Sequence, residues 1–503
     1  MRKRFDPQLT LGTVLISDVE LPLRSRDELP PILGTLQYIF GNADLNESIF
    51  KILEKKICDG KKKTGRTGMD LWHVLVLAVI RHGMGINWDT LELMANDFAL
   101  VRGILGVHNP VSDMNKSLKI TFNRQSVIDN VSLLDDALIH DINMLIVDAG
   151  HKIVNKKKAE EPLVLELKTD SYVLETNVHF PTDLNLLWDS MRKCLDMVGK
   201  LAKASGISYM PGWREIKSYR LKLKSLFRRT TVQVFNGRSE KMKIQLVNEY
   251  IEQSRKLVTD CNALMKSLET TTNKKIKAIV KQLNEYCTYA SKFDNQIERR
   301  LINKEVIPAE EKVFSIFEPD TEWITKGKLN KQVELGHLLL VTTDQHQLIV
   351  DYKVMEDEKD PAQVPPLMER IKENYKGIKI SSHSFDKGFY SKTNKEAVKD
   401  AKVENVIMPK KGKLNKMQKE EESQLLFKQL RNAHSAVESN IHSIKCHGLA
   451  RCMDKGTKHY KRTVGLSVLA YNLHIIGNTI LADERKKQDI LEKQRERYQR
   501  KAA

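Results

Sequence analysis

The sequence predicts an α/β protein: a mixed sheet with flanking helices, interrupted by a large all-helical insertion and preceded by a helical N-terminal domain. Three observations predict this fold class. Apolar and β-branched residues run from Leu163 to Val178, as in a strand. Residues 184–312 have helical composition and spacing almost throughout. After residue 333, apolar strand-like runs alternate with helical patterns, which is typical of a sheet covered by helices.

Length and charge limit the classes of function. The chain has 503 residues, enough for about two to four domains, and its 41% hydrophobic content suits packed cores. Its 83 Lys and Arg exceed its 65 Asp and Glu, and the net charge is +18. This excess, spread along the whole chain, favours nucleic acid as the partner, with an anionic membrane surface as the second choice.

A membrane or secreted location is not expected. The longest apolar run, about Leu71 to Ile80, is far shorter than the ~18 residues of a spanning helix. The start, MRKRFDPQ, has no apolar stretch after its charges and therefore does not resemble a secretion signal. We expect a cytoplasmic protein.

The cysteines do not form a metal-binding pattern. None of the six belongs to a CxxC pair, so we expect reduced thiols. Cys446, His447 and Cys452 lie close together, but no fourth ligand has the spacing of a zinc site.

Shifts in composition divide the chain into segments. We expect an N-terminal arm over 1–62, a helical domain over 63–150, the first part of the sheet domain over 151–183, a basic helical insertion over 184–312, the rest of the sheet domain over 313–480 and a charged helix over 481–503. Within 63–150, a helix over Leu71–Arg81 ends at Gly83–Gly85, and a second begins near Asn87. This is the outline of a DNA-binding helix-turn-helix; the alternative is an ordinary helical hairpin.

The insertion predicts a helical hairpin. Two apolar stripes, over 247–268 and 276–286, flank a break at residues 270–273. Thr182 or Asp183 can cap the helix that opens the segment. The basic residues near Lys222 and Arg229 either form a solvated face or contact phosphate.

The order of elements after the insertion defines the sheet. We expect a hairpin of strands over 333–343 and 347–354, a helix over 364–371, a strand over 378–385, a helix over 393–400, a strand over 403–408 and a long helix over 416–446. Joined to the strand before the insertion, this gives three strands followed by alternating helices and strands. That order is RNase H-like.

Three carboxylates fall at related places in this order. Asp170 lies within the first strand, Asp386 directly follows a strand, and Glu438 lies on the long helix. On that helix Arg431, His434, Glu438, His442 and Lys445 recur at steps of three and four, which puts them on one face. The neighbouring stripe of Ala433, Val437, Ile441 and Ile444 is expected to pack on the sheet. Asp170 alone could equally be an idle edge residue; the other two carboxylates favour a shared site.

Three carboxylates without cysteine ligands suit hard divalent cations, Mg²⁺ or Mn²⁺. Two such ions about 3.5–4 Å apart would activate a water or a 3′-hydroxyl and stabilise the leaving oxygen of a phosphoryl displacement. We expect Asp170 to bridge the two ions, and Asp386 and Glu438 to complete one each.

Three blocks also resemble a known family. TDSYVLETNVHFPTD, FDKGFYS (Phe385–Ser391) and HSAVESNIHSIKCHGLARCMDKG (His434–Gly456) are similar to the catalytic blocks of bacterial insertion-sequence DDE transposases, closest to the ISNCY-type group. The segment TEWITKGK…VELGH (Thr321–His337) resembles the same group. The resemblance implies Asp170, Asp386 and Glu438 as the catalytic triad, and cut-and-paste or copy-type transfer of an element with terminal inverted repeats.

One subfamily signature is half present. Relatives carry Tyr-x2-Arg-x3-Glu-x6-Lys, and this chain keeps Glu438 and Lys445 at that spacing but has Arg431 and His434 at the other two places. The resemblance therefore implies a phosphate contact only for Lys445, and Arg431 and His434 are further candidate DNA contacts.

Other candidate DNA contacts lie near the blocks. Lys387 follows Asp386 directly. Trp323, with Lys326 nearby, could stack on a base at the cleaved end, although simple packing of the indole is the more ordinary reading.

Together these patterns predict a metal-dependent DNA transposase that cuts insertion-element ends and joins the 3′-hydroxyl to target DNA. Its partners would be double-stranded DNA with inverted repeats and target DNA. We expect a homodimer or larger synaptic complex in the bacterial cytoplasm, associated with the nucleoid. The alternatives are an RNase H-like nuclease without strand transfer and a non-enzymatic, transposase-derived DNA-binding protein.

Overall fold

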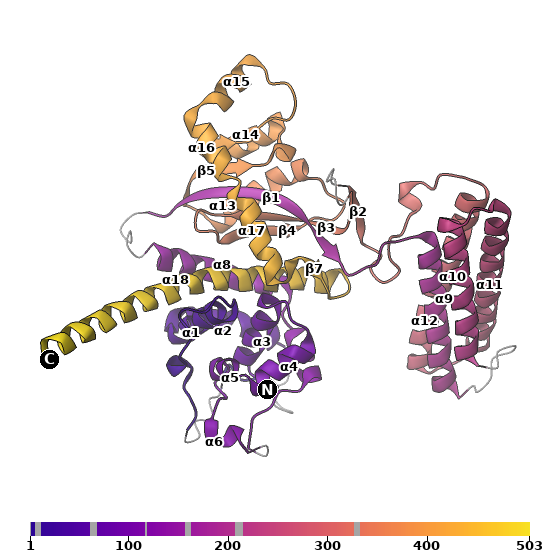
Figure 1. The fold of residues 1–503 in the computed structure, drawn as a ribbon, viewed down its shortest axis with the longest axis horizontal. Helices are drawn as coiled ribbons and strands as arrows, with labels where there is room; N and C mark the ends of the chain where they lie inside the picture. Colours follow the sequence, from indigo (N-terminus) through magenta and orange to yellow (C-terminus); the bar gives the residue numbers. More distant parts are fainter. Residues whose placement is uncertain are drawn as a thin grey trace. The chain divides into compact units, whose positions relative to one another are not determined.

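A computed structural model describes residues 2–5, 12–60, 68–115, 118–155, 162–206, 215–325 and 332–502 (Figure 1). The chain divides into two compact units. The first, here called the sheet unit, comprises Met1–Asn177 and Gly336–Ala503; the second, the helical unit, comprises Val178–Leu335.

The sheet unit begins with a layer of helices. These are α1 (Leu29–Gly41), α2 (Ala43–Ile57), α3 (Leu71–Gly83), α4 (Trp88–Asp97), α5 (Ala99–Ile104), α6 (Pro110–Asp113), α7 (Arg124–Val131) and α8 (Asp136–Val154). Every residue of α3 is buried, so it is the central helix of this layer. Asn87 caps α4 through a bond to the amide of Thr90.

The helices α3 and α4 occupy the place of the expected helix-turn-helix. All of α3 faces protein, and α4 carries Asp89, Glu92 and Asp97 with no Lys or Arg. An acidic helix is repelled by phosphate. DNA binding by this helical pair stays a prediction.

One long helix, α18 (Thr457–Ala502), contributes to two of the cores of the sheet unit. Leu469, Leu473 and Ile476 pack with the N-terminal helices, whereas Val464 and Tyr471 pack with the sheet. The packing helix and the charged tail expected as separate segments are therefore one continuous helix. By length and composition alone, α18 could cross a membrane. Within its apolar 18-residue window, however, 72% is buried inside the protein, as in the core helix of a folded domain.

The sheet combines antiparallel and parallel strands. They are β1 (Val164–Thr176), β2 (Glu322–Thr325), β3 (Val333–Thr343), β4 (Ile349–Val354), β5 (Lys379–Phe385), β6 (Asn405–Ile407) and β7 (Arg451–Cys452). The order is β2-β3-β1-β5-β6, with β4 also paired to β3 and β7 to β1. The expected hairpin is confirmed, because β3 and β4 pair antiparallel; β1 pairs antiparallel with β3 and parallel with β5.

Helices cover both faces of this sheet (Figure 1). Successive residues of a strand point to opposite faces. Leu165 and Leu167 of β1 pack in a core with α13 (Val364–Asn374) and α14 (Lys392–Asp400). Tyr172 and Leu174, on the other face, pack in a core with α18 and the helix that carries Glu438. The even-numbered positions of β1, Asp170 among them, therefore face that helix.

The expected single helix over 416–446 is wrong. The segment forms α15 (Lys416–Ser423), α16 (Leu425–Ala433) and α17 (Ala436–Ile444). Gln424 has extended backbone, with ψ of 140°, which separates α15 from α16. A tight turn at His434, where the amide of Val437 donates to the His434 carbonyl, separates α16 from α17. Ala433 is consequently exposed instead of packed, whereas Val437, Ile441 and Ile444 are buried as expected.

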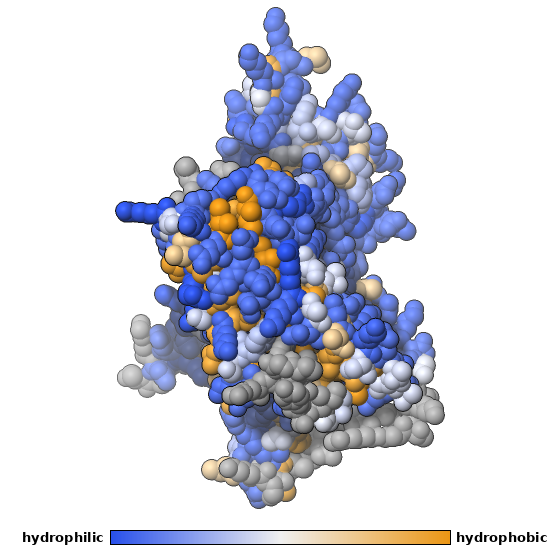
Figure 2. Space-filling model, turned by 90° about the vertical axis from the view of Figure 1, so that its right-hand side faces the viewer, coloured by the Kyte–Doolittle hydropathy of each residue, from blue (hydrophilic) through white to orange (hydrophobic). Residues whose placement is uncertain are grey.

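In its described residues the helical unit contains four long helices. They are α9 (Asp183–Ser205), α10 (Ile216–Asn236), α11 (Glu240–Ser267) and α12 (Lys274–Ile297). The hairpin expected around residues 270–273 is confirmed as α11 and α12, and Thr182 caps α9 by accepting from the amide of Asn185. Figure 2 shows a largely hydrophilic face of the molecule on which hydrophobic side chains gather in small patches.

Candidate active site

The register of the sheet brings Asp170 and Asp386 next to each other. Thr169 of β1 pairs with Phe385 of β5, and the two aspartates directly follow these partners. Neighbouring strands lie about 5 Å apart. Asp386 is exposed at the end of β5, and Asp170 is partly buried, with its Oδ1 accepting from the amide of Ser171 at 2.7 Å.

Glu438 lies on the same face of the sheet. The side chain of His434, just before α17, bonds the Oγ of Ser384 on β5 at 2.9 Å. Asn440 of α17 donates to the Oγ1 of Thr343 on β3 at 3.3 Å. Ser384 and Thr343 both pair with Lys168, so the chain from 434 to 440 crosses β1 near Lys168. Glu438 lies between these two anchors and is exposed.

The three carboxylates thus share one face at the carboxyl end of β5. Asp386 faces the same side as Ser384 by the two-residue period of a strand, and Asp170 the same side as Lys168 and Tyr172. Their oxygens do not converge within 4.8 Å as a group; among the residues that the structure describes, only a set of cysteines does so. Carboxylate oxygens are the ligands that hard divalent cations prefer.

The pKa of His434 depends on the charges near this face. Burial lowers the pKa of His434, the carboxylate of Asp386 opposes that shift, and Lys168 adds to it. His434 therefore lies within electrostatic range of Asp386 and points toward β5, away from the outer face it was expected to share with Arg431.

A buried polar network beneath Asp170 is a feature that the sequence analysis missed. The Oγ1 of Thr169 contacts the Oγ1 of Thr342 at 2.7 Å and the Nε2 of His383 at 2.8 Å. The three side chains are fully buried and link β3, β1 and β5 in one row. Burial, with a smaller effect of His434, lowers the pKa of His383 to about 3. Polar residues inside otherwise apolar strands were the signal that could have found it.

The basic residues expected to contact DNA do not all lie near the carboxylates. The ammonium of Lys445 lies 5.1 Å from the ring centre of Tyr172, on the face that holds Asp170. Arg431 is exposed on α16 and pairs with Glu422 at 3.9 Å. Lys387 is exposed directly after Asp386. These positions place Lys445 and Lys387 near the carboxylates, whereas Arg431 has an acidic partner of its own.

Trp323 lies in the helical unit, against the rings of Phe180 and Phe314 at 5.6 and 5.4 Å between centroids. It is 38% exposed, so packing accounts for most of its surface. Lys326, expected to act beside it, lies outside the described residues. Base stacking by Trp323 stays a prediction.

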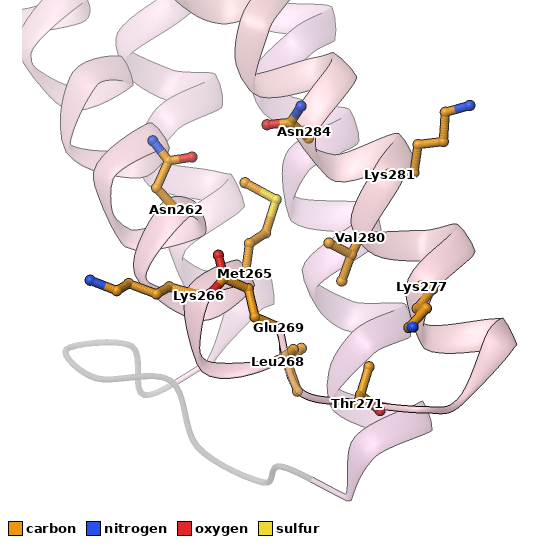
Figure 3. Close-up of a pocket in the computed structure, with 10 residues that line it drawn as sticks. All are labelled: Asn262, Met265, Lys266, Leu268, Glu269, Thr271, Lys277, Val280, Lys281 and Asn284. Atoms are coloured by element: carbon orange, nitrogen blue, oxygen red, sulfur yellow. The ribbon is translucent and has the colours of Figure 1, made fainter.

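A large part of the net positive charge lies in residues 184–312, within the helical unit. Residues 184–312 hold 26 Lys and Arg against 14 Asp and Glu, a net charge of +12 in a chain of +18. A hollow at the turn between α11 and α12 is flanked by Lys266, Lys277 and Lys281 (Figure 3). No triad residue lines it.

Comparison with known proteins finds one family that the later part of the chain resembles. Residues 303–473 match the model of a family described as a transposase DDE domain. The match supports a DDE transposase. It spans 171 of 503 residues and includes Asp386 and Glu438, whereas Asp170 precedes it. Neither a curated protein nor a solved structure matches the chain.

Proposed function

We propose that this DDE transposase cleaves DNA at insertion-element ends and joins the freed 3′-hydroxyl to target DNA, with Asp170, Asp386 and Glu438 as its catalytic residues. The observation that carries the proposal is the placement of all three carboxylates on one accessible face of the sheet. They come from β1, the end of β5 and α17, which are far apart in sequence. The ISNCY-type assignment and the RNase H-like fold belong to the same proposal, and the strand order supports the fold.

The carboxylates would hold Mg²⁺ or Mn²⁺, in a two-ion site bridged by Asp170. Bound cations supply charge stabilisation at the attacking and leaving oxygens of phosphoryl transfer. Asp386 and Glu438 are exposed, so a phosphodiester can reach them without any movement of the core. Lys445 and Lys387 would contact the phosphates on either side of the reacting one.

The partners would be double-stranded DNA with terminal inverted repeats and a target duplex. The net charge of +12 in residues 184–312 supports backbone contact by the helical unit. Because two ends must be cut together, we expect a homodimer or larger synaptic complex, located with the nucleoid in the bacterial cytoplasm.

The test compares Asp170→Asn with wild-type protein on a duplex that carries the inverted repeat found beside the reading frame, in Mg²⁺. Loss of an outer-shell partner of a metal ligand costs about 10–100-fold, so loss of a ligand itself should lower cleavage by at least about 100-fold. Binding of the duplex should change little. Retained cleavage would refute the triad.

Glu166→Gln is the matched control, since Glu166 is an exposed carboxylate on the same strand, four residues before Asp170. Its cleavage should equal that of wild type. A second substrate, pre-nicked at the element end, separates the rivals. Joining to target DNA identifies a transposase, hydrolysis alone identifies a nuclease, and binding without either reaction identifies a DNA-binding protein.

A further inference from the structure

The core of the helical unit contains three converging cysteines. Cys194 lies on α9, Cys261 on α11 and Cys287 on α12. Their Sγ atoms all lie within 4.8 Å of one another, and those of Cys194 and Cys287 are 3.8 Å apart. The side chains are 0%, 0% and 3% exposed. All three are free thiols. Three helices therefore each present one sulfur to a common point.

This spacing is that of a metal site with three thiolates. A metal–sulfur bond is about 2.3 Å, so three sulfurs in a trigonal plane around one ion lie about 4.0 Å apart. The separation of 3.8 Å between Cys194 and Cys287 is close to this value, and the other two separations are no greater than 4.8 Å. Only a small movement of the side chains would be needed to seat an ion.

Packing alone does not require such convergence. A buried cysteine behaves as a small hydrophobe, and the surrounding core is already filled by residues such as Leu187, Leu257 and Leu283. A cysteine binds a metal ion as its thiolate.

The number of ligands selects the kind of ion. Among the described residues no fourth His, Cys, Asp or Glu joins the group. Structural zinc is bound by four ligands, and zinc with three needs a water in the fourth position. These sulfurs are closed to solvent. Soft thiolate ligands also suit Cu(I).

We propose that Cys194, Cys261 and Cys287 form a buried binding site for one soft, thiophilic metal ion of the Cu(I) type, which fastens α9, α11 and α12 together. Binding releases the thiol protons to solvent as the metal–sulfur bonds form. Because the unfolded chain lacks this arrangement, the ion stabilises the folded helical unit by mass action. The site does not depend on the proposed transposase activity.

The test titrates full-length, reduced protein with Cu(I) against a competing chelator. Wild type should bind one equivalent at this site, with three sulfur neighbours at about 2.3 Å by X-ray absorption. At 100 times the dissociation constant, the melting midpoint of the helical unit should rise by roughly 5–10 °C. Cys261→Ser should lose that equivalent and the rise.

Cys446→Ser is the matched control, because Cys446 is the exposed cysteine and lies outside the group. It should bind as wild type does. Cys261→Ala, compared with metal-free wild type by circular dichroism and melting, shows whether the metal-free fold survives the substitution. The proposal is overturned if a Cys261 variant with intact fold keeps the full Cu(I) stoichiometry. It is also overturned if Zn²⁺ binds more tightly than Cu(I) with the same cysteine dependence.

Discussion

Acid should destabilise the sheet at the candidate site, because the buried His383 resists protonation in the folded protein. Burial holds the pKa of His383 at about 3, below the ~6.5 of an exposed histidine. The folded protein therefore binds fewer protons than the unfolded chain. The contribution of His383 to stability is complete above pH 6.5 and is lost as the pH falls toward 3. At about 1.4 kcal/mol per pH unit, the loss at pH 5 is about 2 kcal/mol.

The assay is hydrogen exchange of the amides of β1 and β5, measured at pH 7 and pH 5 and corrected for the intrinsic exchange rate. A loss of about 2 kcal/mol corresponds to a fall in protection of about 30-fold. His383→Phe keeps the ring that stacks on Phe385 at 4.1 Å, and leaves Thr169 its bond to Thr342. The variant should lose that part of the pH dependence.

The difference between variant and wild type isolates His383, because burial also lowers the pKa of His434 and His474. His442→Gln, at an exposed position of α17, is the control and should behave as wild type. Equal pH dependence in His383→Phe and wild type would refute the reasoning.

Two further predictions concern charges of the sheet unit. Arg81→Met breaks a buried pair with Asp454, whose side chains are 8% and 14% exposed, and should lower the free energy of unfolding by about 3 kcal/mol, measured with urea. Arg24→Met removes an exposed pair with Asp489 and should cost less than about 1 kcal/mol; equal losses would contradict this account. Lys445→Gln should weaken DNA binding and reduce the slope of log affinity against log salt by about 1. Lys399→Gln, exposed on α14 across the sheet, should leave the slope unchanged, and a slope altered equally in both variants would show that Lys445 has no special contact.

The strands were predictable because their signal is local. Val333–Thr343 was expected and observed with the same bounds, since apolar and β-branched residues fill β3 and a turn follows directly. Asp386 was likewise expected at a strand end, and it directly follows β5. Local sequence determines such elements, so their order along the chain could be predicted, whereas the short strands β2 and β7 were not expected.

The helix at Glu438 was not predictable in detail because contacts with the sheet shape it. No glycine or proline lies at Gln424, where the helix breaks. The turn at His434 is held by a hydrogen bond to Ser384, fifty residues earlier in the chain. The assumption of one continuous helix therefore placed the side chain of His434 on the wrong side. The cysteine group was equally hidden: its members are 67 and 26 residues apart, and only the packing of three helices brings them together.

The long helix α18 makes the first and last parts of the chain fold together. The hydroxyl of Thr35 donates to the carbonyl of Leu473 at 2.7 Å, a contact between residues 438 positions apart. The helices near the N-terminus are synthesised first, yet their core also contains Leu466, Leu469 and Leu473 of α18. Contacts between such distant residues slow folding, and an apolar surface that stays exposed in the meantime is prone to aggregate. The nascent chain therefore carries an open hydrophobic core until α18 has left the ribosome.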